Sequence, residues 1–172
     1  MEWTPSQKGA IAETAIAAAA VELGVGVYRP IAEGERYDLI FDLRPQLVRV
    51  QCKWAVREGA VVSVRCQSNR RTATGFLARP YTSAEIDAIA AYCAELRQCY
   101  FLPISLVDGR RQVYLRLSPT KNNQARGVNF AADYQLGAIA QLGERPAGSR
   151  KVGGSNPPSS TREAAHIGRL FS

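Results

Sequence analysis

The stretch RYDLIFDLRPQLVRVQCKWAV, residues 36–56, decides the fold because it predicts a β-hairpin with one apolar face. Large apolar residues alternate with polar ones along both halves, which is the period of a half-buried strand. Three polar residues are unexpected in so regular a hairpin, namely Asp38 on the first strand and Gln51 and Lys53 on the second. Their relative positions depend on how the two strands pair.

The register of the hairpin follows from directing both apolar sets toward one core. We predict that Leu39 lies opposite Cys52, which places Asp38 opposite Lys53. Gln51 is then a diagonal neighbour of Asp38, close enough for the two side-chain tips to converge on one ion. The hairpin therefore brings an acid, an amide and an amine together on its polar face.

A second acid of the hairpin, Asp42, has a different interpretation. The same register places Asp42 opposite Arg49 near the turn, where the two charges are expected to form a cross-strand ion pair. The predicted register therefore selects Asp38 over Asp42 as the candidate metal ligand.

An acid, an amide oxygen and an amine are the groups that metal-assisted phosphodiester hydrolysis requires. Mg²⁺ prefers oxygen ligands and retains several waters. The ion would make a hydroxide available, while Lys53 could orient the attacking water or offset phosphate charge. Glu13, on an alanine-rich predicted helix, could add a carboxylate, although a solvated helix residue is an equally good interpretation of its position.

The remaining elements predict an α/β (α+β) fold with a mixed sheet flanked by helices. A helix is expected from about Ser6, its N-cap, to Leu23, with Gly24 or Gly26 ending it. A second helix is expected over residues 82–96, because TSAEIDAIAAYCAEL begins like a capping box and has helical periodicity. Other strands are expected at residues 25–31, 60–66, 98–104 and 111–117, loops at 67–75 and 118–127, and a short helix at 130–136.

Length and composition indicate one domain in a soluble, cytoplasmic protein. The chain has 172 residues, of which 46% are hydrophobic, but no apolar run long enough to cross a membrane and no signal peptide at its start. We therefore expect no membrane partner. The four cysteines lack CxxC spacing and are interpreted as small buried apolar residues.

The end of the chain differs in composition from the rest. From Gly137 onward it is rich in Gly, Ser and Pro, which predicts disorder. The segments AQLGER and GGSNP also resemble the translated D-arm and T-arm of a tRNA gene, so we infer that the reading frame runs into such a gene. Residues 1–136 are thus the predicted domain and residues 137–172 a tail.

Several ordered segments resemble one nuclease family. Asp38, then twelve residues, then Gln51-Cys52-Lys53, preceded by KGAIAE on a helix, resembles the PD-(D/E)XK nuclease superfamily with its restriction-endonuclease-like core. The group I intron-associated endonucleases of this superfamily are similar over about residues 6–136. That resemblance rests on these segments in order: KGAIAETA, RYDLIFD, VQCKW, YTSAEIDAIAAYC, CYFLP and LRLSPTKNNQARGVNFAADY.

The resemblance implies a site and a reaction. Glu13, Asp38 and Gln51 would hold Mg²⁺ or Mn²⁺, and Lys53 would be the catalytic lysine of a homing endonuclease that cuts double-stranded DNA. Because one such site cuts one strand, a homodimer or homotetramer is expected. Gln51 stands where the family usually has an acid, so the site carries one negative charge fewer.

A formal charge of +7 favours a polyanionic partner such as DNA. Lysine and arginine side chains suited to phosphate are Lys8, Arg49, Arg65, Arg70 and Arg71. The loop TKNNQARG has side chains suited to base edges, including Lys121, Asn123 and Arg126, although an ordinary polar loop is an alternative.

Two other functions remain open at this point. A Holliday-junction or other structure-selective nuclease would share the same core, and a catalytically inactive nucleic-acid-binding protein could retain the fold. The LAGLIDADG and GIY-YIG motifs of other homing endonucleases are absent, and the single histidine, His166, cannot supply an HNH site.

Overall fold

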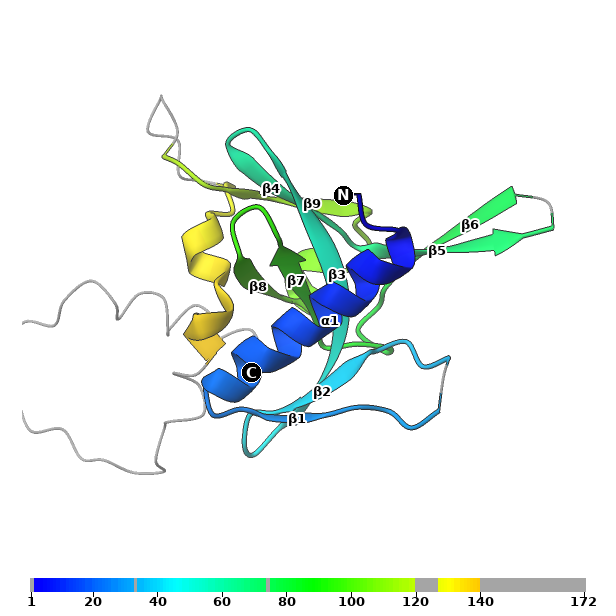
Figure 1. Ribbon diagram of the computed structural model, residues 1–172, viewed down its shortest axis with the longest axis horizontal. Coiled ribbons are helices and arrows are strands. Elements are labelled where there is room, and N and C mark those ends of the chain that lie inside the picture. The colour runs from blue at the N-terminus through cyan, green and yellow to red at the C-terminus, as the bar shows by residue number, and fades with distance from the viewer. Residues whose placement is uncertain (1, 33, 74, 120–126, 140–172) are drawn as a thin grey trace, which may run out of the picture.

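A helix packed on a mixed sheet forms the body of the molecule. Figure 1 shows α1 (Pro5–Glu22) lying across one face of the sheet, while the hairpin of β5 (Gln67–Thr72) and β6 (Gly75–Pro80) projects from the body. The structure, a computed structural model, describes residues 2–32, 34–73, 75–119 and 127–139. The predicted α/β (α+β) fold with a mixed sheet and flanking helices is confirmed.

Seven strands form one sheet within the described part of the chain. Five of them follow the order β1 (Gly26–Tyr28), β2 (Leu39–Asp42), β3 (Leu47–Glu58), β4 (Val61–Arg65) and β9 (Gln112–Arg116). The other two are β7 (Ala88–Cys93), which pairs with β3, and β8 (Gln98–Pro103), which pairs with β7. The long strand β3 is therefore the centre of the sheet, antiparallel to β2 and β4 and parallel to β7.

The N-terminal helix begins with a side-chain cap. Thr4 Oγ1 accepts a hydrogen bond from the Gln7 N–H, and the Gln7 side chain accepts one from the Thr4 N–H, which is a complete capping box. The predicted N-cap at Ser6 is thus wrong by two residues, because Pro5 occupies the first helical position, which proline favours. The predicted end is confirmed, since Gly24 follows the helix with φ 77°.

The buried face of α1 consists of residues one turn apart. Ala12, Ile16 and Ala20 are all at most 1% exposed and pack on the face of the sheet that presents Phe41 and Val50. A second cluster fills the other face of the sheet, around β7, β8 and β9. The sheet is therefore covered on both faces, with α1 on one of them.

The predicted second helix is wrong, because residues 88–93 form the strand β7. The capping signal still makes one turn, in which the N–H groups of Glu85 and Ile86 both contact the Thr82 carbonyl. The chain then becomes extended and pairs with β3 in parallel. A parallel strand that is buried on both faces has a continuous apolar sequence without alternation. In β7 this sequence is rich in alanine, which also favours a helix, and the prediction was wrong for that reason.

The predicted loop at residues 67–75 is also wrong in part. Most of it forms β5, which pairs with β6 in a two-stranded sheet from Gln67–Pro80 to Thr72–Gly75. Apolar alternation is absent from this hairpin because it projects from the body instead of covering the core (Figure 1). Hydrophobic periodicity therefore gave no signal for it.

Other predicted elements are confirmed. β1 is an edge strand, as Pro30 suggested, and the short C-terminal helix appears as η1 (Ala131–Tyr134) and η2 (Leu136–Ile139), two 3₁₀ turns. The four-residue helix α2 (Ile104–Val107), which links β8 to β9, was not predicted. All four cysteines are buried, as interpreted from the sequence.

The chain end lies largely outside the described residues. Ile139, three residues past the predicted domain boundary, is fully buried in the cluster under α1. The tRNA-like segments and His166 fall in residues 140–172, which the structure does not describe. In the described part of the chain, no helix has the length and apolar character needed to span a membrane.

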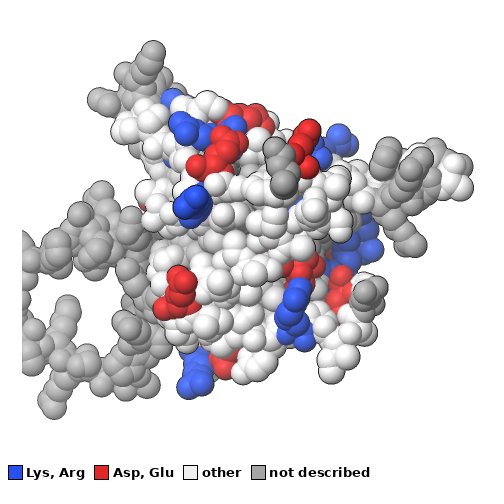
Figure 2. Space-filling model, in the orientation of Figure 1, with Lys and Arg blue, Asp and Glu red and all other residues white. Residues whose placement is uncertain are grey.

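Charges of both signs are interspersed on the face that carries α1. Figure 2 shows acidic and basic side chains interspersed around a largely uncharged centre, with basic ones near the base of the β5–β6 hairpin. Among the described residues, this face carries no extended patch of one sign. The net charge of the chain therefore does not locate a nucleic-acid surface there.

Ile16→Ala should lower the free energy of unfolding by about 2–5 kcal/mol, because it leaves a cavity between α1 and the sheet. Urea unfolding followed by circular dichroism measures this loss. Val21→Ala, on the same helix at a position 60% exposed, is the matched control and should change stability little. Equal losses in the two variants would contradict the packing of α1 described above.

Candidate active site

Asp38 and Gln51 meet where β2 begins. The Asp38 N–H donates to the Val50 carbonyl at 2.9 Å, and Leu39 pairs with Val50 in the ladder. Asp38 Oδ2 accepts hydrogen bonds from the Gln51 amide and, at 2.8 Å, from the Cys52 N–H. The acid and the amide predicted from the sequence are therefore in direct contact.

The predicted register of the hairpin is wrong by two residues. Leu39 lies opposite Val50, not opposite Cys52. A shift of two keeps every side chain on its predicted face, so the alternation of apolar residues could not distinguish the two registers. The turn at Arg44–Pro45, closed by the Leu43 N–H and the Gln46 carbonyl, sets the observed one.

The shift changes the partners of the charged residues. Asp38 faces Gln51 directly instead of Lys53. Asp42 lies opposite Leu47 and pairs with Arg44, so its predicted ion pair with Arg49 is wrong. Arg49 instead contacts Asp87, with Nη2 2.8 Å from Oδ1.

The Asp38 carboxylate is partly desolvated. Burial raises the pKa of Asp38, and the nearby Glu13 charge adds to the rise, whereas the Cys52 N–H and the Lys53 charge lower it. These couplings connect the helix glutamate, the acid and the lysine electrostatically. The charged form of Asp38 is therefore supported first by the Cys52 N–H and then by the positive charges of Lys53 and Arg29.

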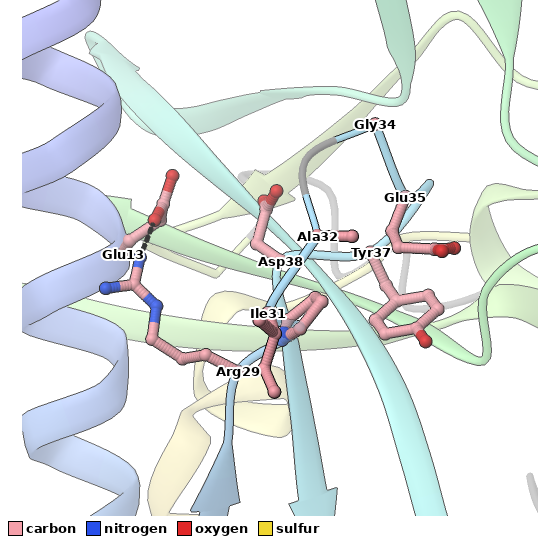
Figure 3. A pocket seen from close by; sticks show the side chains of 9 residues that line it. Glu13, Arg29, Ile31, Ala32, Gly34, Glu35, Tyr37 and Asp38 are labelled. Atoms are coloured by element: carbon pink, nitrogen blue, oxygen red, sulfur yellow. Dashed lines mark hydrogen bonds and ion pairs between the residues drawn. The ribbon is translucent and has the colours of Figure 1, made fainter.

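Glu13 approaches this site from α1. It lines a pocket of about 530 Å³ together with Asp38, and Figure 3 shows the two carboxylates beside each other. Arg29, from the segment after β1, forms an ion pair with Glu13. Arg29 therefore balances the Glu13 charge in this state, a role that the sequence analysis did not predict.

Lys53 lies two residues beyond Gln51 on β3. Its Nζ donates a hydrogen bond to the Tyr81 hydroxyl at 2.8 Å. Burial lowers the pKa of Lys53, the Asp38 carboxylate raises it and the Arg36 charge lowers it. Burial also raises the pKa of Tyr81 to about 12, so its hydroxyl stays protonated at neutral pH.

The donor set fits a hard divalent cation. The Gln51 Nε2 contacts Asp38 Oδ2 and lies 3.3 Å from the Cys52 carbonyl oxygen, so two oxygens already converge beside this amide. Turning the amide over exchanges its nitrogen for its oxygen. Asp38, Gln51 and Glu13 could then present oxygen ligands, which Mg²⁺ and Mn²⁺ accept.

The number of charged ligands is small. Among the described residues, no three side chains of the His, Cys, Asp and Glu types form a group able to hold a metal ion. The site consists instead of two carboxylates and an amide. One acid fewer would weaken cation binding relative to a site with three acids.

The predicted DNA-contacting residues lie in several places. Lys8 and Arg65 line one pocket of about 640 Å³ with Lys53. Arg70 and Arg71 belong to β5, but their side chains fall outside the described part of the structure. The predicted base-reading residues Lys121, Asn123 and Arg126 also lie outside it.

Arg49 differs from the other predicted phosphate ligands. Its guanidinium donates to Asp87 and to the carbonyls of Ser83 and Ala84. These bonds tie β3 to the turn before β7, so any phosphate contact by Arg49 would compete with them.

Comparison with known proteins identifies the family. The sequence model of the family described as PD-(D/E)XK endonuclease matches residues 3–137. The chain belongs to the PD-(D/E)XK endonuclease family. No curated protein sequence matches this endonuclease.

A solved structure shows the same fold. The structure of a bacterial homing endonuclease, I-Ssp6803I, matches with a TM-score of 0.65 and 23% sequence identity, covering 81% of this chain and 94% of that chain. At this identity the likeness establishes only that the present chain has the same fold as that structure. The chemistry of the site in the present chain has to be argued from its own residues.

Sequence reasoning missed the neighbours of the site. Arg29 lies in a segment predicted only as an edge strand, and Tyr81 directly precedes the segment predicted as a helix. Arg36 is the first residue of the stretch predicted as the hairpin, two residues before Asp38. No local pattern marks these residues, because their contacts in the site depend on how the segments pack together in the fold.

Asp38→Asn should raise the free energy of unfolding at neutral pH in EDTA, since the variant removes a charge that burial disfavours. Because the pKa is raised, Asp38 in the folded protein becomes protonated at a higher pH than Asp38 in the unfolded chain as the pH is lowered. Below the ordinary pKa of 3.8, Asp38 is neutral in both the folded and the unfolded state. The advantage of the variant should therefore shrink as the pH falls. Urea unfolding over a pH series tests this, and a widening advantage at acid pH would contradict it.

Gln51→Glu should lower the unfolding temperature in EDTA, because a second carboxylate would replace the amide that donates to Asp38. Mg²⁺ or Mn²⁺ should then raise that temperature more in the variant than in the wild type, since added charge strengthens cation binding to the folded state. Gln46→Glu, at an exposed turn position of the same hairpin, is the matched control. An equal metal response in both variants would contradict a metal site at Gln51.

Proposed function

We propose that this protein is a Mg²⁺-dependent DNA endonuclease of the homing type that hydrolyses phosphodiester bonds of double-stranded DNA. The observation that carries the proposal is the contact of Asp38 with Gln51, with Glu13 and Asp38 lining one pocket and Lys53 two residues along β3 from Gln51. Family membership and the fold shared with a homing endonuclease support it.

The residues of the site divide the work of hydrolysis. When bound, the cation would supply a hydroxide at neutral pH and neutralise phosphate charge. The Cys52 N–H fixes the Asp38 carboxylate, so one ligand is held by the backbone of the same hairpin. Lys53 places a single positive charge near enough to Asp38 for each to shift the pKa of the other, where it would orient water or offset charge that develops on the phosphate.

DNA binding would use cationic residues around this centre. Lys8 and Arg65 line one pocket with the catalytic Lys53, an arrangement in which these two residues are suited to phosphates flanking the one that is cleaved. Arg70 and Arg71 lie on the projecting β5–β6 hairpin, which could extend the contact along the duplex (Figure 1). A homodimer or homotetramer would supply one site for each DNA strand.

Lys53→Ala should reduce the cleavage rate by about a hundredfold or more, because it removes the charged group that would orient water or offset charge on the phosphate. Binding of DNA should persist, measured by gel shift in Ca²⁺. Arg57→Ala, which removes a positive charge from the far end of β3, is the matched control and should cleave like the wild type.

The cleavage assay uses duplex, four-way junction and single-stranded DNA with Mg²⁺, and EDTA as the metal-free control. Cleavage of duplex at a defined site, lost in EDTA and in Lys53→Ala, supports the proposal. Preference for junctions would instead favour a structure-selective nuclease. Binding without cleavage by the wild type in every metal and substrate would make the protein a nucleic-acid-binding protein.

A further inference from the structure

Tyr81 is buried against the catalytic lysine. It is 2% exposed, and its hydroxyl accepts the hydrogen bond of Lys53 Nζ at 2.8 Å. The two residues come from distant segments, since Lys53 is on β3 and Tyr81 follows β6. The Tyr81 N–H contacts the Cys66 carbonyl at 3.4 Å, which fixes its backbone beside the end of β4.

Arg36 holds the Tyr81 ring from one side. Its guanidinium carbon lies 4.4 Å from the centre of the ring, within the range of a cation–π contact. The same guanidinium donates to Ser68 Oγ at 2.9 Å, to the Glu85 carboxylate and to the Pro80 carbonyl. These bonds fix Arg36, so the ring beneath it has little freedom to turn.

A fixed hydroxyl matters because lysine is a flexible side chain. Its ammonium sits on a four-carbon stem with many rotamers, and a displacement of about 1 Å can reduce an enzymatic rate about a hundredfold. In the described part of the chain, Lys53 forms no ion pair that would hold it in place. Tyr81 therefore fixes the ammonium through the hydrogen bond to its hydroxyl, and its ring centre, 4.9 Å from Nζ, adds a cation–π contact that a phenylalanine would keep.

We propose that Tyr81 is a positioning residue, which holds the Lys53 ammonium at the cleavage site while Arg36 fixes the tyrosine ring. This role rests on the proposed nuclease function. Tyr81 acts through Lys53 and needs no contact with the DNA. Removing its hydroxyl should therefore slow the chemical step without weakening DNA binding.

Tyr81→Phe tests this role because it removes the hydroxyl and keeps the ring beneath Arg36. We expect kcat to fall about tenfold or more while KM for DNA stays unchanged, since only the placement of Lys53 is altered. Tyr100→Phe is the matched control, because Tyr100 has the same 2% exposure and belongs to the same buried cluster. It should leave kcat unchanged.

A double-mutant cycle separates positioning from a general structural effect. In single-turnover assays with excess enzyme, Tyr81→Phe should cause no further loss in a protein that already carries Lys53→Ala. Wild-type kcat in Tyr81→Phe, or losses that multiply in the double variant, would overturn the role while leaving the nuclease function intact. A wild-type protein that cuts no DNA would overturn both.

Discussion

The site depends on one constraint, which is that β3 pairs along its length with three other strands. Its alternate residues Val48, Val50 and Cys52 are buried under α1, so Gln51 and Lys53 must point to the opposite side. Hydrogen bonds to β2 and β7 prevent β3 from sliding. Gln51 and Lys53 therefore keep fixed positions, because a shift of β3 would expose the buried residues Val48, Val50 and Cys52.

Charges placed on such a strand are stabilised by specific partners. Burial opposes ionisation at both Asp38 and Lys53, and each charge favours the ionised form of the other. The Cys52 N–H supports Asp38, and the Tyr81 hydroxyl supports Lys53. A site of this kind gives up folding stability for fixed geometry, because burial opposes the charge on both residues.

The substitution of an amide for an acid distinguishes this endonuclease from the usual family pattern. Gln51 donates a hydrogen bond to Asp38, whereas a carboxylate there would repel it. In the absence of a cation, the amide therefore keeps the pair satisfied, and Arg29 does the same for Glu13. Cation binding would then replace hydrogen-bond and ion-pair partners, so affinity reflects an exchange of contacts as well as the number of charges.

The sequence alone determined which faces of the hairpin are buried, where α1 lies, and that Asp38, Gln51 and Lys53 share a neighbourhood, because alternation and helical periodicity are local. Tertiary structure decided the rest. A register shift of two residues leaves alternation unchanged, so only the turn and the pairing with neighbouring strands selected it. The alanine-rich segment of β7 became a strand because it fills a slot between β3 and β8, overriding its helical pattern. Tyr81 meets Lys53 across 28 residues of chain and Arg29 meets Glu13 across 16, so both contacts depend on tertiary packing.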